Sequence, residues 1–379
     1  MMQARHLASV SAVASGQWDA LFPGEAEGHA YYLACEATAP PAFTFSAIGV
    51  FRGDELIAAA PVFKVVYRLD MALQGFARRI SDFVARVLPR LLCLPLLALG
   101  SPLAERCHIG FLAGLSAEER DRAADLLLAA LEARAKELRV GLIGVKDLAL
   151  PDDAGLRATL VSRGFARMNS LPVATLDTVF PSEDAYIAAL SANERSALRR
   201  KIKKSVRDGI RIEHRADLAG IEPLIVGLYA DTRKNSDVDY GDFEDLQPPY
   251  FAAVLRALGP RAFCFLYWLG DDLLAFNLIL LDDTRMIVKY IGMLYPRGRD
   301  HNLYFVSWMH QLRYCLAHGL REMQTGQTAY RQKIRLGSRL VPGFVYFRHS
   351  NRLFNLALRF AARFTAFDKM DPDLKGLAQ

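Results

Sequence analysis

Residues 262–294 read AFCFLYWLGDDLLAFNLILLDDTRMIVKYIGML, three apolar runs separated by two short acidic turns. The turns are Gly270–Asp272 and Asp282–Thr284. Apolar runs joined by turns rich in Gly and Asp are typical of antiparallel hairpins. The segment therefore predicts a three-stranded meander, with strands at Ala262–Leu269, Leu273–Leu281 and Met286–Leu294.

The elements that follow the meander repeat an order already present in the first half of the chain. The pattern predicts helices at Leu303–His318 and Ala329–Leu336, and strands at Glu322–Thr325 and Phe344–Arg348. In the first half we predict a hairpin, a strand, a helix, a strand, a helix and an extended segment: Thr44–Phe51, Glu55–Val66, Cys107–Leu112, Ala117–Leu138, Val140–Val145, Leu156–Arg163 and Phe165–Leu176.

This repetition predicts an α+β fold of two tandem units. Each unit would be a mixed, mostly antiparallel sheet flanked by helices, with a basic helical arm between the two. We expect the first unit at 1–180, with an amphipathic insertion at 67–97, and the second, carrying any chemistry, at 181–350. An amphipathic helix and tail would follow at 351–379.

The composition is that of a globular protein long enough for two cores, with 379 residues of which 52% are hydrophobic and 23% charged. The net charge of +6 favours anionic partners without naming one. Five cysteines without a C-x-x-C pair argue against a disulfide framework and a zinc site. The N-terminal residues do not resemble a signal peptide, and the apolar run Val87–Leu99 is shorter than the roughly 20 residues of a spanning helix. We therefore expect a cytoplasmic protein, free or peripheral on the inner membrane face.

Three predicted helices carry an excess of basic residues. Ser182–Asp208 is predicted as one long helical stretch with a capping box at Ser191 and Glu194, and its part from Arg195 to Arg207 has seven basic residues and no acidic one. This arm is either a solvated surface or a site for a polyanion. Helices at 73–88 and 353–367 place Leu and Phe on one side and Arg on the other. Such helices either pack on a core or lie in a membrane surface.

Polar side chains interrupt the apolar elements of the second half. Asn277, Lys289, Gln324 and Lys333 fall where an unpaired polar group would cost about 1–3 kcal/mol. They therefore need protein partners or a ligand.

Three stretches carry a resemblance to a known family: YIAALS at 186–191, RSALRRKIKK at 195–204 and GQTAYRQKIRLG at 326–337. Together with the order of elements over 185–348, they resemble the GCN5-related N-acetyltransferase (GNAT) fold. The similar branch includes the Fem-type peptidoglycan aminoacyltransferases and related proteins of bacterial envelope and polysaccharide loci. That branch builds two such units in tandem.

The resemblance implies an N-acyltransferase. Such an enzyme transfers an acyl or aminoacyl group from acyl-CoA or aminoacyl-tRNA to an amine, without a metal, in envelope, polysaccharide or specialised metabolite synthesis. GNAT enzymes that bind coenzyme A usually show Q/R-x-x-G-x-G/A after the fourth strand, where backbone amides hold the pyrophosphate. Here that place reads YPRGRDHN at 295–302, with one glycine and two arginines. The acyl donor is thus left open between coenzyme A and tRNA.

The resemblance and the polar residues together predict a site where the fourth and fifth strands separate. For catalysis we name Tyr330 as the proton donor, Lys289, and as candidate bases His301 and Asp231. Predicted substrate contacts are Asn277, Tyr290, Gly292, Gln324, Thr325, Lys333, Tyr240 and Arg233. Predicted donor contacts in the phosphate-like loop are Arg297, Gly298, Arg299 and Asn302.

Each of these residues also has a purely structural interpretation. Lys289 is either a substrate ligand or a charge on an edge strand, and Asn277 is either a ligand or a satisfied core amide. Gly292 marks either a bulge, beside which an amide of Ile291–Met293 binds the oxyanion, or an ordinary strand position. The alternative function is a non-catalytic protein that keeps the fold and binds a membrane surface or a polyanion.

Overall fold

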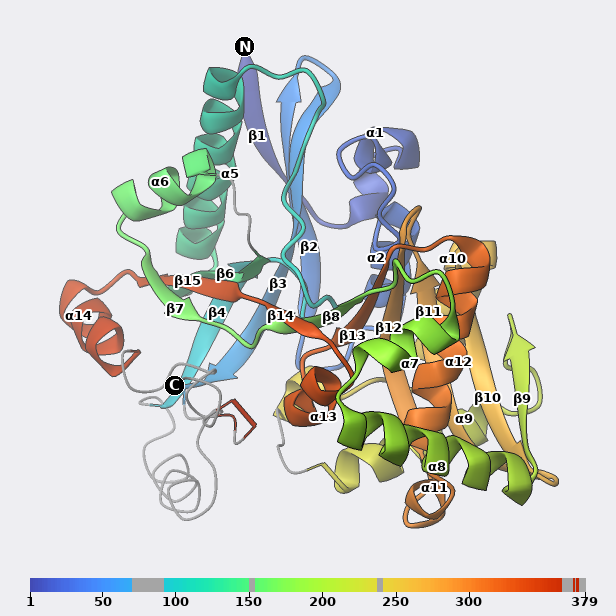
Figure 1. The fold of residues 1–379 in the computed structure, drawn as a ribbon. Helices are drawn as coiled ribbons and strands as arrows, with labels where there is room; N and C mark the ends of the chain where they lie inside the picture. The colour runs from blue at the N-terminus through green and yellow to red at the C-terminus, as the bar shows by residue number, and fades with distance from the viewer. Residues whose placement is uncertain (70–91, 150–153, 237–240, 363–370, 372, 375–379) are drawn as a thin grey trace. The chain divides into compact units, whose positions relative to one another are not determined.

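The computed structural model describes residues 1–69, 92–149, 154–236, 241–362, 371 and 373–374. The chain forms two compact units, of which the first takes residues 1–172, 240–246 and 341–379, and the second 173–239 and 247–340 (Figure 1). Each unit contains one sheet with helices packed on it. This is the predicted α+β class.

The sheet of the first unit has eight strands, in the order β1-β2-β3-β4-β6-β15-β7, with β5 paired to β3. Strands β4 and β6 pair in parallel. Its strands are β1 Met2–Leu7, β2 Thr44–Arg52, β3 Glu55–Arg68, β4 Cys93–Leu99, β5 Gly110–Phe111, β6 Leu142–Ala149, β7 Ala166–Asn169 and β15 Gly343–His349. Its helices are α1 Ser15–Asp19, α2 His29–Ala37, α5 Ala117–Glu137, α6 Ala154–Ser162 and α14 Arg352–Ala361.

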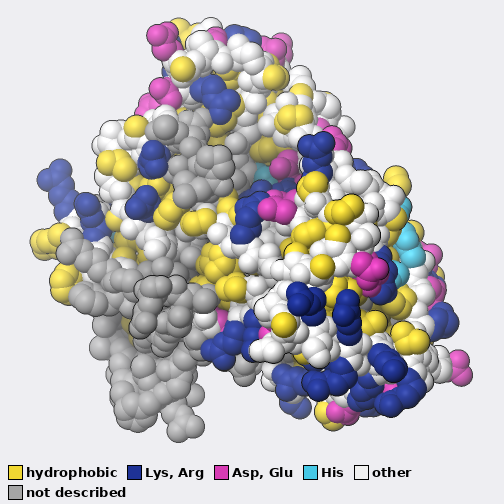
Figure 2. Space-filling view, in the orientation of Figure 1, with side chains coloured by type: hydrophobic (Ala, Val, Ile, Leu, Met, Phe, Trp, Pro, Cys, Tyr) yellow, Lys and Arg dark blue, Asp and Glu magenta, His cyan; other side chains and the backbone are white. Residues whose placement is uncertain are grey.

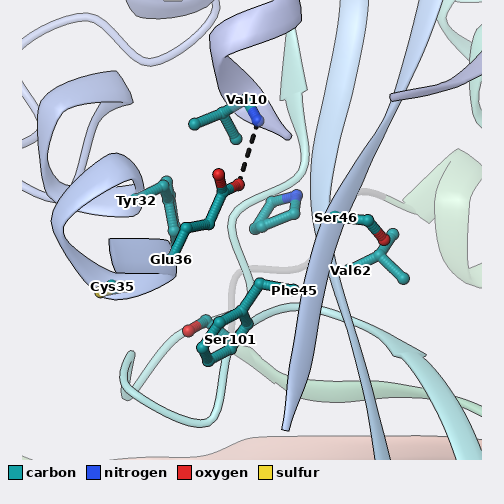
Figure 3. A pocket seen from close by; sticks show the side chains of 9 residues that line it. Val10, Tyr32, Cys35, Glu36, Phe45, Ser46, Val62 and Ser101 are labelled. Atoms are coloured by element: carbon teal, nitrogen blue, oxygen red, sulfur yellow. Dashed lines mark hydrogen bonds between the residues drawn. The ribbon is translucent and has the colours of Figure 1, made fainter. Parts of the chain in front are cut away.

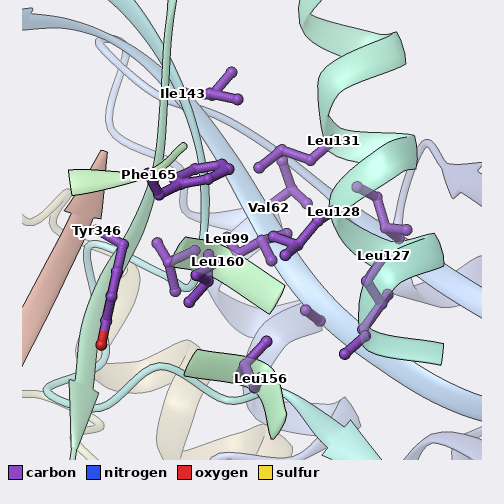
Figure 4. Close-up of a cluster of buried hydrophobic side chains, with 14 of the residues drawn as sticks. Val62, Leu99, Leu127, Leu128, Leu131, Ile143, Leu156, Leu160, Phe165 and Tyr346 are labelled. Carbon is purple, nitrogen blue, oxygen red and sulfur yellow. The ribbon is translucent and has the colours of Figure 1, made fainter. Parts of the chain in front are cut away.

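Helix α5 supplies much of the first unit's core. Its N-terminus is closed by a complete capping box between Ser116 and Glu119. Figure 4 shows Leu127, Leu128 and Leu131 of this helix directed toward the strand residues Val62, Leu99 and Ile143. Burial of this leucine stripe is what holds the helix on the sheet.

The sheet of the second unit has seven strands, in the order β14-β8-β13-β12-β11-β10-β9. They are β8 Val173–Asp177, β9 Ile210–Arg215, β10 Ala262–Leu269, β11 Asp272–Leu281, β12 Arg285–Met293, β13 Glu322–Gly326 and β14 Arg339–Val341. Its helices are α7 Glu183–Ala189, α8 Ala192–Asp208, α9 Glu222–Lys234, α10 Tyr250–Leu258, α11 Arg297–Asp300, α12 Leu303–His318 and α13 Tyr330–Arg335.

Helices cover both faces of the second sheet. On one face Phe265 of β10 contacts His310 of α12, with ring centroids 4.5 Å apart. On the other, Phe276 of β11 contacts Phe251 of α10, with centroids 5.3 Å apart. Alternate residues of the meander therefore face α12 or the pair α9 and α10.

Two predicted segments belong to sheets other than expected. The strand predicted at Phe344–Arg348 as the last of the second unit is β15, which pairs with β6 and β7 in the first sheet. The extended segment predicted at Phe165–Leu176 divides into β7 in the first sheet and β8, which pairs with β13 in the second. Because β8 and β15 each join the other sheet, the bounds of the observed units differ from the predicted segments 1–180 and 181–350.

Smaller differences concern the arm and the insertion. Leu190 and Ser191 break the stretch Ser182–Asp208 into α7 and α8. Ser191 caps α8 by accepting from the Glu194 amide at 3.3 Å, but the Glu194 carboxylate pairs with Arg335 instead of returning to the cap. Strand β4 begins within the predicted insertion 67–97 and ends beyond it at Leu99, and the helix predicted at 73–88 lies outside the described residues. Among the helices described, none is both long and apolar enough to span a membrane.

Candidate active site at the open ends of strands β12 and β13

The second sheet opens between β12 and β13. These parallel strands pair over only three positions, from Arg285 with Glu322 to Ile287 with Gln324. Beyond Ile287, β12 continues to Met293 without any described strand beside it on that side. β13 ends at Gly326, still paired with β8. The second half of β12 therefore presents an open backbone edge.

A β-bulge shapes this part of β12, but it lies at Lys289 and not at Gly292. Leu278 pairs with Tyr290 whereas Ile279 pairs with Val288, which leaves Lys289 as the extra residue. Gly292 pairs regularly with Phe276. The bulge reverses the alternation of side chains, so that Lys289 is buried at 6% exposure.

Gly292 is explained by close packing of α9 on the strand. A Cβ atom at this position would collide with the Phe276 ring and lie 2.8 Å from the backbone nitrogen of Tyr229. Tyr290 faces the same side and contacts the rings of Tyr229 and Phe251. These two predicted substrate residues thus lie on the sheet face opposite Asn277.

Side chains of α9 hold the end of β12. Thr232 Oγ1 accepts a hydrogen bond from the Met293 amide at 2.7 Å and donates to the Met293 carbonyl at 3.3 Å. The Asp231 carboxylate accepts from the Tyr295 amide at 2.6 Å. Asp231, named as a candidate base, is therefore engaged in fixing the chain. Thr232 was not singled out from the sequence, because its role depends on a strand 61 residues away.

The amide of Ile291 faces the open edge. Alternate amides of a strand point to the same side, so Ile291 N–H follows the direction of Met293 N–H, away from β11. Asn277 lies opposite Ile291 on β11 and is 1% exposed. Its Oδ1 is buried and accepts no hydrogen bond from the part of the chain that is described. An unmatched buried oxygen of this kind is costly, which makes Asn277 a candidate for a ligand contact.

β13 ends beyond its short pairing with β12, and α13 follows it in the chain. Tyr330 is fully buried, and Lys333, 5% exposed, donates from Nζ to the carbonyl of Thr325. Thr325 Oγ1 donates to the Ala174 carbonyl at 3.1 Å. Gln324 Oε1 accepts from Arg285 at 3.2 Å. Lys333, Thr325 and Gln324 thus all have protein partners.

The phosphate-like loop folds as a short helix, α11, whose amides are used internally. The amides of Gly298 and Arg299 bond to the carbonyls of Leu294 and Pro296, and those of residues 300–302 likewise bond to residues 296–299. A Cβ at Gly298 would collide with Met293. The glycine at position 298 is therefore explained by close packing and not by a pyrophosphate cradle.

The side chains of this loop are engaged as well. Arg297 pairs with Asp272 at 2.8 Å, and the Arg299 guanidinium lies 4.8 Å from the centre of the Tyr295 ring. His301 Nδ1 lies 2.8 Å from Asp208 Oδ2, and this hydrogen bond lowers the pKa of Asp208.

Three predicted contact residues remain. Asn302 adopts φ 56° and precedes α12. Arg233 lies in the last turn of α9. Tyr240 lies outside the described residues. Of the predicted residues, Asn277 thus lies on β11 opposite Ile291, whose amide faces the open edge, and Tyr330 and Lys333 lie on α13, which follows β13.

A second polar cluster lies in the first unit and was not predicted. His108 Nδ1 is 2.5 Å from the Tyr32 hydroxyl, and Nε2 is 3.7 and 3.8 Å from the carboxylates of Glu25 and Glu27. His108 and Glu27 are 7% and 2% exposed, and burial raises the pKa of Tyr32. These residues come from loops and from α2.

Tyr32 also borders a small pocket with room for about one water molecule. In this pocket Glu36 accepts a hydrogen bond from the Val10 amide at 3.0 Å (Figure 3). Ser46 and Ser101 lie on its other side (Figure 3). Among the described residues, no group of three or more His, Cys, Asp or Glu side chains is arranged to hold a metal ion.

Comparison with known proteins finds a similarity in the second half of the chain. Residues 192–333 match the family model described as an acetyltransferase (GNAT) domain. Two curated proteins of Mycobacterium tuberculosis, from strains CDC 1551 / Oshkosh and ATCC 25618 / H37Rv, carry the provisional name 8-amino-7-oxononanoate synthase 2. Each is 28% identical over 173 residues, which is 45% of this chain and 22% of the relative. The chain therefore spans about a fifth of the length of these relatives.

Solved structures share the fold over nearly the whole chain. FemX superposes with a TM-score of 0.57 and 12% identity, covering 87% of this chain and 93% of FemX. A tandem GNAT protein from the clavulanic acid biosynthesis pathway gives 0.54 and 14%, covering 93% and 99%. L-PGS from Bacillus licheniformis gives 0.50 and 11%, covering 91% and 97%. At these identities the likeness establishes a tandem arrangement of GNAT folds.

Proposed function

We propose that the second unit, which contains most of the stretch 192–333 that matches the acetyltransferase (GNAT) domain, joins an acyl or aminoacyl group to an amine at the opening between β12 and β13. The donor is an activated ester or thioester. A reaction of this kind would serve envelope, polysaccharide or specialised metabolite synthesis. The observation that carries the site is the buried, unmatched Asn277 Oδ1 opposite the Ile291 amide at an open strand edge.

In this proposal the open edge binds the donor carbonyl. The Ile291 amide donates to the carbonyl oxygen, and this bond strengthens as the oxygen gains negative charge. The amine attacks the carbonyl carbon, forming a C–N bond, and the C–S or C–O bond to the leaving group then breaks. Asn277 Oδ1 accepts a hydrogen bond from an N–H of the bound substrates and so orients them.

Two proton transfers complete the reaction. The amine nitrogen loses one proton, either to water or to a base other than Asp231 and His301, because the side chains of these two are already hydrogen-bonded within the fold. Tyr330 donates its phenolic proton to the leaving group and regains one from solvent, since a buried phenol is a usable general acid. The Lys289 and Lys333 ammonium groups, both buried, bias the opening toward a negatively charged donor or intermediate.

Activity measurements on single variants test this site. With acyl-CoA and charged tRNA as donors and mass spectrometry of products from a panel of amines, we expect Tyr330→Phe to lower kcat/KM by about 10²-fold or more. Asn277→Leu should lower it at least tenfold. Tyr314→Phe, a conservative change of a tyrosine on α12 that contacts His318, is the matched control and should keep full activity. Full activity of both site variants, with unchanged circular dichroism, would refute the assignment.

The donor class follows from a binding measurement. The amides of α11 are internally bonded, so a pyrophosphate has no preformed backbone cradle there, and this favours aminoacyl-tRNA over coenzyme A. Calorimetry with acetyl-CoA, a long-chain acyl-CoA and a charged tRNA separates the donors. A chain that binds none of them would be a non-catalytic binder that keeps the fold.

We further propose that the protein works in the cytoplasm and on the inner membrane face, which it meets through α14. This helix exposes Leu353 by 81%, Leu356 by 66% and Phe360 by 61%, beside the exposed cations Arg352 and Arg359. Such a helix has the composition of an interfacial membrane helix. The helix predicted at 73–88 was named for the same role and lies outside the described residues. Fractionation of cells producing wild type and Leu353→Gln/Leu356→Gln tests the location, with loss of the membrane fraction expected for the variant.

A further inference from the structure

We propose that the outer face of α8 is a docking surface for an anionic lipid bilayer. The helix runs over Ala192–Asp208 in the second unit. Figure 2 shows Lys and Arg side chains gathered on the molecule where Figure 1 labels α8. The proposal concerns a contact that the acyl-transfer site does not require.

Four exposed cations define this surface, which we call the α8 face: Arg199, Arg200, Lys203 and Arg207. At about 100° per residue they fall within an arc of roughly 100° on the helix. They span eight positions, or about 12 Å along the axis. Arg199, Arg200 and Lys203 form no ion pair with the described part of the chain, and Arg207 pairs with Asp208 at 3.6 Å while 76% exposed.

The other charges of α8 are turned to the protein. Arg195 donates to the carbonyls of Ala188 and Leu190 at 3.0 and 2.8 Å, which closes the end of α7. Lys201 Nζ lies 3.2 Å from the centre of the Phe305 ring. Lys204 donates to the carbonyl of Asp300.

The two acids of α8 are turned inward in the same way. Glu194 pairs with Arg335 at 3.1 Å, and Asp208 with His301 at 2.8 Å. Leu198 and Ser205, 1% and 3% exposed, lie on the side packed against the protein. The charged side chains on the outward face are therefore all cationic.

The chemistry of this face favours lipid over nucleic acid. Single-stranded nucleic acid is held by stacking on aromatic rings, and α8 has no aromatic residue. Val206 is 74% exposed and lies at the border of the cations. An apolar side chain beside cations suits the headgroup layer of a bilayer, where each Lys or Arg near an anionic surface adds about a fivefold factor in affinity.

The test compares two variants that remove the same charge. The first is Arg199→Gln/Arg200→Gln/Lys203→Gln/Arg207→Gln, in which Gln keeps a good helix propensity. The control is Arg122→Gln/Lys136→Gln/Arg139→Gln/Arg321→Gln, which removes four exposed cations from other elements. Binding of the full chain is measured by co-sedimentation with phosphatidylcholine vesicles, with and without 30% phosphatidylserine, at about 0.1 M salt.

We expect the wild type to bind the anionic vesicles at least tenfold more tightly than neutral ones, and the α8 variant to lose at least tenfold of that affinity. The control variant should stay within about threefold of wild type. Equal losses in both variants would mean that net charge alone acts, and unchanged binding of the α8 variant would mean that another surface binds. Either result overturns the proposal, as does absence of vesicle binding by the wild type. So would α8-dependent binding of bulk tRNA without α8-dependent vesicle binding.

Discussion

At position 292 one methyl group decides how closely α9 can lie on β12. Gly292→Ala would place a Cβ against the Phe276 ring and 2.8 Å from the backbone nitrogen of Tyr229, and a helix backbone cannot yield locally. We expect a loss of about 1–3 kcal/mol in the free energy of unfolding, as for overpacking of a buried contact. Urea denaturation measures it.

The matched control is Gly227→Ala on α9 itself. Nothing lies within 4 Å of a Cβ at that position, so we expect a gain of about 0.5–1 kcal/mol from helix propensity. Equal stability of the two alanine variants would contradict the packing argument for Gly292.

His310 makes stability depend on pH. Burial lowers its pKa from 6.5 to about 4, with smaller effects from Arg313 and His214. Because the unfolded chain binds a proton that the folded chain rejects, stability falls as pH drops from about 6.5 to 4. The partial exposure of the ring reduces the expected loss to about 1–2 kcal/mol.

The corresponding variant is His310→Gln, which has no ionisable group at this position. Denaturant unfolding at several pH values should show a shallower decline for it than for the wild type. His318→Gln, on the same helix, should keep the wild-type decline. A parallel decline in wild type and His310→Gln would assign the pH dependence to other groups.

Buried polar residues could be predicted from the sequence more readily than the bulge and the packing that surround them. Asn277 and Lys333 stood out because they interrupt apolar runs, and both are buried at 1% and 5% exposure. The bulge at Lys289 could not be located from local sequence, because it exists only relative to the register of β11. Similarly, the sequence around Gly292 does not indicate that helix α9 packs closely against this residue.

Thr232 links two elements, since it fixes the end of β12 to α9. Thr232→Val keeps the shape but removes a hydroxyl that bonds to both the amide and the carbonyl of Met293. Leaving these backbone groups unmatched should cost about 1–3 kcal/mol. The Ile291 amide lies two residues away on the same edge, so we also expect kcat/KM to fall about tenfold.

Thr232→Ser retains the hydroxyl and is the control for this element-level effect. It should stay within about 1 kcal/mol and keep near wild-type activity. If Thr232→Val retains full activity while losing stability, the strand end is not part of the site.

Local signals determine how well each element could be predicted. The strand at Ala262–Leu269 and the helix at Leu303–His318 occur at the predicted bounds, because turn residues and a glycine mark their ends. β4 was not predicted: its short apolar sequence Cys93–Leu99 continues an apolar run that has no turn before it. The predicted cap at Ser191 does begin α8, but the helix-forming residues before it led to the prediction of one continuous stretch.

At the scale of the whole molecule, the element order was predictable but the membership of the sheets was not. A strand's sequence shows that it will be buried without showing which neighbour it pairs with. β8 and β15 are each short and apolar, and each joins the sheet of the other half of the chain. The tandem repeat was therefore visible in sequence, whereas the exchange of strands required the structure.

This exchange makes the first unit depend on residues near the C-terminus. β15 lies between β6 and β7, and β7 has no other strand partner among the described residues. A chain truncated after residue 342 should lose the pairing on both sides of β15, and a new exposed edge at β6 should promote aggregation. A chain truncated after residue 350 keeps β15 and loses only α14 and the residues beyond it.

Comparison of the two truncated chains separates the contribution of β15 from that of α14. We expect the chain ending at 350 to unfold cooperatively, with slow hydrogen exchange at the amides of β6 as in the full chain. The chain ending at 342 should lose that protection in β6 while the amides of β10 and β11, in the other sheet, remain protected. Protection of β6 without β15 would mean that the first sheet is stable without the returning strand, and that the two halves fold as separate segments.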